Sequence, residues 1–90
     1  MQSVMKKLQN YIMTIIPKEE RIITCYMQTC LAYVNYGAIS NSDVRAFFGL
    51  DSNEKVKISR VIKETLNANL IKPVDKEQAP RYMKYIPIWA

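Results

Sequence analysis

The chain has 90 residues, with 13 Lys or Arg against 8 Asp or Glu, so its formal net charge is +5. It contains no histidine and only 2 glycines. This excludes histidine-based catalytic triads, zinc sites with histidine ligands and the glycine-rich loops that bind nucleotide phosphates. The length suits one domain with one core, and the charge favours a polyanionic partner or an anionic membrane surface. We therefore expect a binding domain without a cofactor, not an enzyme.

The cysteines and the hydropathy bear on the compartment. Cys25 and Cys30 are five positions apart, which separates them by about 140° on a helix, so they are poorly placed to pair with each other. Unpaired thiols are typical of intracellular proteins. No apolar run approaches the ~20 residues of a membrane-spanning helix, and the first residues lack the pattern of a signal peptide. We expect a cytoplasmic protein that does not enter a membrane.

Residues 1–16 are predicted to form an amphipathic helix that lies outside the main domain. Lys6 and Lys7 are on its polar side, and Pro17 ends it. Its apolar stripe must be covered, either by its own domain or by a second copy of the chain. A third alternative is that this segment marks where a longer chain was cut. We assign the stripe as a candidate dimerisation surface. Its residues are Val4, Leu8, Ile12 and Ile15.

The second predicted helix runs from Pro17 to about Tyr36 and ends at Gly37, a residue that often follows the last helical turn. Apolar residues recur along it at helical spacing, which predicts a buried face. This places Cys30 in the core and Cys25 outside it. The predicted buried residues are Ile23, Tyr26, Met27, Cys30, Tyr33 and Val34.

Two further helices are predicted. Ser40 and Asp43 have the spacing of a capping box for a short helix that ends at Gly49, with Val44, Phe47 and Phe48 on its apolar face. The next helix covers residues 53–68 and buries Ile58, Val61, Ile62, Thr65 and Leu66. Asn69 follows it, where a left-handed backbone conformation is expected.

The period then changes to that of a hairpin. Residues 70–74 are predicted as a strand that Pro73 confines to a sheet edge, and residues 81–86 as the returning strand after a polar turn. The expected fold class is mainly α with a small β-hairpin. Residues 17–90 would form a winged helix-turn-helix, preceded by the extra amphipathic helix of residues 1–16.

In such a fold the helix over residues 53–68 is the recognition helix, laid in the major groove of double-stranded DNA. Arg60 would contact a base edge, and the residues near the helix start would contact phosphates. The predicted DNA-binding residues are Ser52, Asn53, Lys55, Lys57, Ser59, Arg60 and Lys63 on the helix, and Lys76 and Arg81 on the wing. Two alternatives stay open: a solvated helix face, and a winged helix that binds protein, in an oligomer or within a longer chain.

Three stretches carry a family resemblance. They are Ile39-Ser40-Asn41-Ser42-Asp43-Val44-Arg45 with Phe48-Gly49-Leu50; Arg60-Val61-Ile62-Lys63-Glu64-Thr65-Leu66 with Leu70-Ile71-Lys72-Pro73; and the ending Tyr85-Ile86-Pro87-Ile88-Trp89-Ala90. Together they resemble the C-terminal winged-helix domain of bacterial RecG-related, AlbA-type proteins, which are described as ATP-dependent DNA helicases or transcriptional regulators.

The resemblance covers about residues 17–90, and Asn69 stands where such proteins tend to have glycine. It implies a DNA-binding domain whose parent chain carries an ATP-binding portion upstream. Nothing in these 90 residues matches that portion, so the resemblance implies neither ATPase nor helicase activity for this chain.

Overall fold

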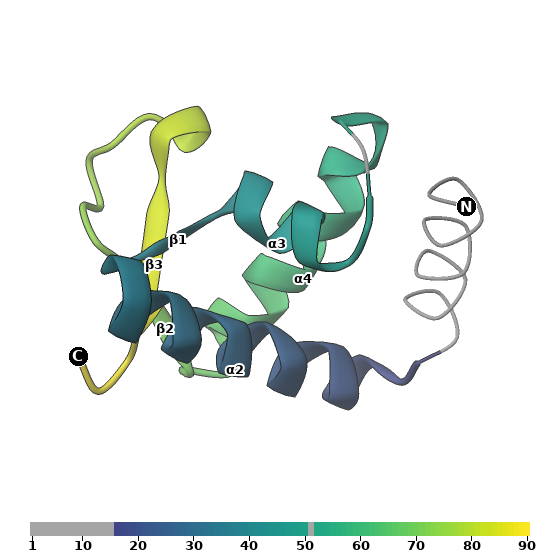
Figure 1. Cartoon of the computed structure of the whole chain (residues 1–90), viewed down its shortest axis with the longest axis horizontal. Coiled ribbons are helices and arrows are strands. Elements are labelled where there is room, and N and C mark those ends of the chain that lie inside the picture. Colours follow the sequence, from purple (N-terminus) through teal and green to yellow (C-terminus); the bar gives the residue numbers. More distant parts are fainter. Residues whose placement is uncertain (1–15, 51) are drawn as a thin grey trace.

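The computed structural model describes residues 16–50 and 52–90, the side chain of Ser52 excepted. This part of the chain is mainly helical with a small antiparallel sheet, as the sequence predicts (Figure 1). The predicted helix over residues 1–16, with Val4, Leu8, Ile12 and Ile15, lies outside the described residues but for Ile16. The elements are α2 (Lys18–Tyr36), β1 (Ile39–Ser40), α3 (Asn41–Phe47), η1 (Ser52–Glu54), α4 (Lys55–Asn67), β2 (Ile71–Pro73), η2 (Pro80–Tyr82) and β3 (Lys84–Pro87), where η marks a single 3-10 turn.

The helix ends follow the sequence signals. α2 begins after the extended Pro17 and ends at Gly37, whose φ of 98° needs a residue without a Cβ. α3 begins with the predicted capping box: the Asp43 backbone N–H donates to Ser40 Oγ, and the Ser40 N–H donates to Asp43 Oδ2. Asn69 has the expected positive φ, 60°, after α4.

The buried face of α2 is not the predicted one. Cys25 and Thr29 are fully buried, whereas Ile23, Met27 and Val34 are exposed by 53%, 57% and 76%. Cys30 is only half-buried, so the prediction that Cys30 lies in the core and Cys25 outside it is wrong. At about 100° per residue, the observed face is rotated by roughly 120° from the predicted stripe.

Small side chains explain this phase. Thr29 Oγ1 donates to the Cys25 carbonyl at 2.7 Å, and Thr65 Oγ1 on α4 donates to the Val61 carbonyl at 2.8 Å. Each hydroxyl is satisfied within its own helix, so both threonines are buried without an unpaired polar group. Cys25 of α2 contacts Thr65 of α4, and small side chains at such a contact favour a short distance between packed helices.

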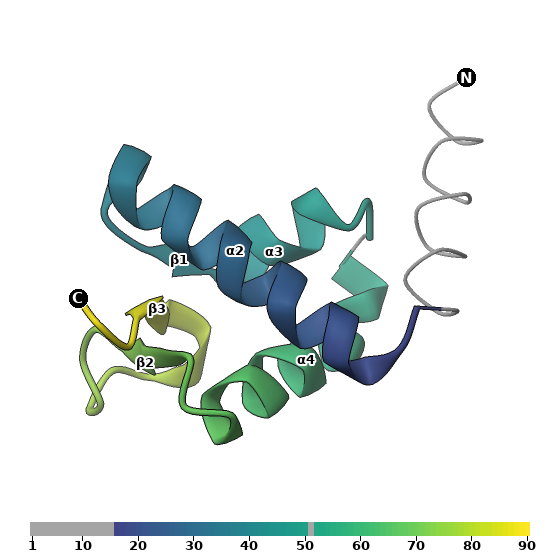
Figure 2. The same cartoon turned by 90° about the horizontal axis from the view of Figure 1, so that it is seen from below.

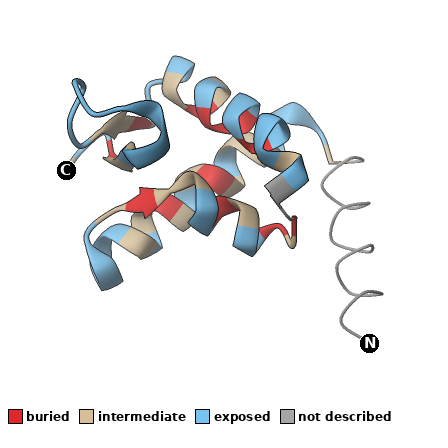
Figure 3. Cartoon of the chain, turned by 90° about the horizontal axis from the view of Figure 1, so that it is seen from above, coloured by how far each residue is buried: buried red, intermediate tan, exposed pale blue. Residues whose placement is uncertain are grey.

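α4 buries four of the five residues that its spacing predicts, since Ile58, Val61, Ile62 and Thr65 are at most 3% exposed, whereas Leu66 is half-buried at the edge of the core. In α3, Val44 and the following Phe48 are buried, but Phe47 is 44% exposed and rests edge-on against the Phe48 ring. The prediction that Phe47 lies on the apolar face is therefore wrong. Figure 3 shows the buried residues gathered where the helices and the sheet meet.

The sheet has one strand more than the predicted hairpin. Its order is β1-β3-β2, both pairings are antiparallel, and β1 pairs Ile39 with Tyr85 and Ser40 with Lys84. Pro73 lies at the end of the edge strand β2, as expected. The returning strand begins at Lys84, because Pro80–Tyr82 form the turn η2, so Arg81 and Tyr82 lie in the β2–β3 loop (residues 74–83) and not in a strand.

The last residues close the structure against α2. Trp89 Nε1 donates to the Tyr26 hydroxyl at 2.8 Å, and the Trp89 ring meets the Tyr33 ring edge-on at 5.6 Å between centroids. Lys72 Nζ donates to the Ala90 carbonyl. Figure 2 shows α2 running past both the sheet and α4.

Candidate nucleic-acid interface

A groove of about 370 Å³ lies where α3, α4 and η2 converge, and we call it the basic groove. Three cationic side chains from three different elements line it: Arg45 from α3, Lys55 from α4 and Arg81 from η2. No described residue that lines it is acidic. Its other lining residues are Ser40, Asn41, Ser42, Ser59 and Pro80. The groove therefore combines positive charge with short polar side chains, a set that suits phosphate oxygens.

A hydrogen-bond network holds the floor of the basic groove. Arg45 Nε donates to Asn41 Oδ1 at 2.9 Å, and a terminal Arg45 nitrogen donates to Ser42 Oγ at 3.1 Å. The Asn41 amide in turn donates to Ser59 Oγ at 3.1 Å, which joins α3 to α4. Two of the five guanidinium N–H donors are thus engaged in orienting Arg45, and the remaining donors are in fixed positions.

A second hollow, of about 250 Å³, continues the basic groove along α4. It shares Asn41, Ser59 and Pro80 with the groove and adds Lys63 as a further cation. Its apolar lining comes from Ile62, Leu66, Met83 and Tyr85. Lys55, Ser59 and Lys63 therefore follow one side of α4, four residues apart, and face the β2–β3 loop.

Arg60 lies beyond this side on the outward surface of α4. It is exposed, as are Val56, Ser59 and Lys63, so the face that the sequence predicts to point away from the core does so. At about 100° per residue, Arg60 is roughly opposite the Ile58–Ile62 side of the helix, which is buried. Arg60 is therefore accessible to a partner placed over α4.

Lys57 is on the other side of α4 and does not line the groove. Its Nζ is 3.4 Å from Glu54 Oε2, and Glu64, also on that side, is 3.8 Å from Lys18 Nζ of α2. These acids reduce the positive potential there and leave the groove side of α4 as the cationic one. The structure therefore separates Lys57 from Lys55 and Lys63, which the sequence had grouped.

Arg81 and Lys76 both lie in the β2–β3 loop, but only Arg81 lines the basic groove. The Arg81 guanidinium is 4.9 Å from the centre of the Tyr82 ring, and this cation–π contact holds it over the loop. Lys76 is exposed in the turn at residues 75–78. Asn53 is exposed in η1, before the first turn of α4, and the side chain of Ser52 is not described.

Sequence reasoning missed Arg45 and Asn41 as site residues. Both are on α3, and they join the site only because β1 and α3 lie beside α4 and the loop in three dimensions. A signal was present, since Val44 and Phe48 are four apart and face the core, which turns Arg45 and Asn41 toward one neighbouring side.

Two titratable groups near the site have perturbed pKa values. Burial raises the pKa of the Cys25 thiol, against the opposing effect of hydrogen bonds with Thr65 and Thr29. Burial also raises the pKa of Tyr85, and the neighbouring Cys25 adds to this rise. Both groups therefore stay protonated and neutral at physiological pH, and neither supplies a thiolate or phenolate for chemistry.

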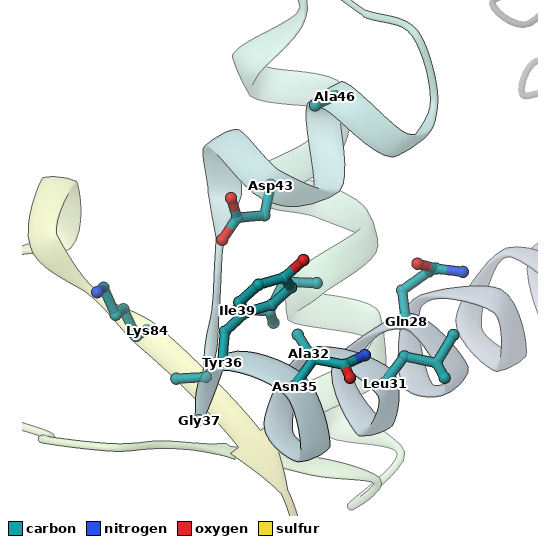
Figure 4. Close-up of a pocket in the computed structure, with 11 residues that line it drawn as sticks. Gln28, Leu31, Ala32, Asn35, Tyr36, Gly37, Ile39, Asp43, Ala46 and Lys84 are labelled. Carbon is teal, nitrogen blue, oxygen red and sulfur yellow. The ribbon is translucent and has the colours of Figure 1, made fainter.

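A larger hollow, of about 590 Å³, lies beside the C-terminal half of α2 (Figure 4). Leu31, Tyr36 and Ile39 give it an apolar side, and Asp43 and Lys84 contribute its charges. Because Asp43 is committed to the α3 cap, this hollow has no cluster of unengaged charges of one sign. It is therefore a less specific candidate than the basic groove.

Comparison with protein-family models, with curated proteins and with solved structures finds no match to this chain. Over residues 16–50 and 52–90, no helix has the length and apolar character to cross a bilayer. The same residues hold no group of three or more cysteine, aspartate or glutamate side chains that could bind a metal ion.

Proposed function

We propose that residues 17–90 form a winged-helix domain that binds double-stranded DNA through the basic groove and the outward face of α4. In this proposal α3 and α4 are the helix-turn-helix pair, α4 is the recognition helix, and the β2–β3 loop is the wing. The element order α2-β1-α3-α4-β2-β3 and the small three-stranded sheet support this assignment.

The observation that carries the proposal is the convergence of Arg45, Lys55 and Arg81 from three elements on one groove with no acid among its described lining residues. Cations that only keep a protein soluble have no reason to converge, because their mutual repulsion is unfavourable unless an anion binds between them. The cationic lining continues from the groove to Lys63 along α4, so the positive charge is extended, as binding to a run of phosphates requires.

The exposure and the hydrogen bonds of Arg45 and Arg60 suggest a different role for each in the proposed DNA binding. Arg45 is oriented by Asn41 and Ser42 and is half-buried, so it suits a fixed phosphate contact that positions the duplex. Arg60 is exposed on the outward face and suits a guanine edge in the major groove, where a guanidinium can donate two hydrogen bonds. Ser59 is already engaged by Asn41 and serves to set the distance between α3 and α4.

The wider role that the resemblance implies is part of this proposal: a cytoplasmic, DNA-binding end of a bacterial RecG-related regulator or helicase-related protein with an ATP-binding portion upstream. Residues 85–90, which carry part of the resemblance, pack within the fold and do not line the basic groove. Trp89 contacts Tyr26 and Tyr33 of α2, and Tyr85 lies in the central strand. None of these contacts involves the groove cations.

The test is a titration of duplex DNA with the full chain at several salt concentrations. The three groove cations, together with Lys63 of the adjoining hollow, predict a slope of about −3.6 for log K against log salt, at ~0.9 per neutralised phosphate. A zero slope, or affinity at low salt no tighter than ~1 mM, which corresponds to only about −4 kcal/mol, would refute the proposal and favour a protein-binding module.

A further inference from the structure

The exposed side of α2 is an apolar surface that nothing in the described chain covers. Ile23, Met27, Leu31 and Val34 are each more than half exposed on one side of the helix, and Cys30 lies among them. Tyr33 and Trp89 border this side. We call this surface the α2 stripe: Ile23, Met27, Cys30, Leu31 and Val34.

The α2 stripe has the spacing of a helix-pairing seam. Ile23, Met27, Cys30 and Val34 are separated by four, three and four residues, the alternation that keeps one side of a helix in contact with a partner helix. A second α2 has the same spacing by definition, so the stripe is complementary to itself under a two-fold axis. Residues 22–36 also contain no charged side chain, which matches the depletion of charge at the centre of protein interfaces.

The apolar area exposed on and beside the stripe is similar to the apolar area of a standard interface. The exposed fractions of Ile23, Met27, Leu31, Val34, Tyr33 and Trp89 are 53%, 57%, 55%, 76%, 37% and 56%. Applied to roughly 120 Å² for an aliphatic and roughly 200 Å² for an aromatic side chain, they leave about 480 Å² exposed on each copy. A standard interface buries about 800 Å² per partner, of which about 450 Å² is apolar.

We propose that α2 pairs with the α2 of a second copy of this chain in antiparallel orientation. Glu19 and Glu20 lie in the first turn of α2, and a parallel pair would bring these like charges together. An antiparallel pair separates them and opposes the two helix dipoles favourably. The seam is centred between residues 28 and 29, so Met27 packs against Cys30 of the second copy, and the two Cys30 side chains lie about 4.5 Å apart along the axis.

This surface is separate from the basic groove. The buried side of α2 meets α4 through Cys25 and Thr65, whereas Arg60 and Lys63 face away from that contact. Pairing through the α2 stripe thus leaves the groove cations accessible, and each proposal is tested without the other. Loss of the dimer leaves the salt-dependent DNA affinity of one domain in place, and loss of DNA binding leaves the dimer mass in place.

The first experiment measures the mass of the full chain by light scattering over a wide concentration range. We expect a rise with concentration to twice the monomer mass of 10.5 kDa. Met27→Glu places a charge in the seam and should give a monomer at every concentration. Asn35→Glu, the same charge at an exposed position of α2 beside the seam, is the matched control and should keep the dimer. Circular dichroism confirms that both variants keep the helical content of the wild type.

The second experiment tests whether residues 1–16, and not a second α2, cover the α2 stripe or form the dimer interface. Leu8→Asp with Ile12→Asp should leave the dimer unchanged, and a short bis-maleimide should join two wild-type chains through Cys30 but not two Cys30→Ser chains. A wild-type chain that stays monomeric overturns the proposal. A dimer lost in the Leu8/Ile12 variant assigns the interface to residues 1–16. A dimer that appears only in that variant shows that residues 1–16 cover the stripe within one chain.

Discussion

Neutralising one groove cation at a time gives the sharpest test of DNA binding. Lys55→Met and Arg81→Met remove one charge each from the basic groove while keeping an apolar stem of similar length, and Arg45→Met does the same at the restrained position. Each groove cation that contacts a phosphate contributes about 0.9 to the slope of log K against log salt. The expected slope therefore falls from about −3.6 to about −2.7 in each variant. At a salt concentration of about 0.1 M the same term lowers the affinity roughly eightfold.

The assay is fluorescence anisotropy of a labelled duplex at four or more salt concentrations. Lys18→Met is the matched control, because Lys18 lies on α2 beside Glu64 and away from the groove. We expect its slope to equal that of the wild type. If the three groove variants change the slope no more than Lys18→Met does, the convergence of cations has another cause and the groove is not the phosphate site.

Four further outcomes are expected. Arg60→Ala should weaken binding to a selected DNA sequence by ~1–3 kcal/mol and remove the base preference at one position in a competition assay. An equal loss of affinity on every sequence would make Arg60 a phosphate contact. Ile58→Ala should lower the free energy of unfolding in urea by ~2–5 kcal/mol, because Ile58 is fully buried. Val56→Ala should lower it by less than ~0.5 kcal/mol, because Val56 on the same helix is 70% exposed. Equal losses would contradict the assigned face of α4. At concentrations low enough to keep the chain monomeric, maleimide should label Cys30 of the folded protein far faster than the buried Cys25. Burial raises the pKa of the Cys25 thiol, so the unfolded chain loses this proton first as pH rises above the ordinary thiol value. Stability should therefore decline at alkaline pH, and less so in Cys25→Ala.

Local signals predicted the parts of the fold that short-range chemistry determines. The Ser40–Asp43 capping box, the turn at Gly37, the positive φ of Asn69 and the edge position of Pro73 each depend on a few neighbouring residues. The core face of α4 was predictable because its large branched side chains recur at helical spacing. The outward direction of Arg60 and Lys63 follows from that face.

The phase of α2 was not predictable in this way. Counting large apolar residues favoured the stripe around Met27, but the contact with α4 uses Cys25 and Thr29, whose small size permits close packing. Thr29 is a polar residue, but its hydroxyl donates a hydrogen bond to the Cys25 carbonyl, so Thr29 can be buried. The large apolar residues of α2 therefore lie on its outer surface, and no local sequence pattern predicts this.

The basic groove was partly predictable. The sequence identified Lys55, Ser59 and Arg81, which line the groove, and Lys63, which lines the adjoining hollow. It did not identify Arg45, which reaches the site because α3 packs beside α4. β1 is the link that sequence reasoning lacked. A two-residue strand has no detectable period, and its existence depends on β3, more than forty positions away.

Ser40 gives the site a mechanical property. It is the last residue of β1, where it pairs with Lys84 at the base of the β2–β3 loop, and its side chain caps α3. One residue thus couples the two opposite walls of the groove, α3 and the loop. Separating α3 from the start of β3 would break this pairing or this cap, so we expect the proposed DNA site to keep its shape and to lose little conformational entropy on binding. The proposed binding of duplex DNA should therefore be a rigid docking event, in which the DNA and not the protein adjusts its shape.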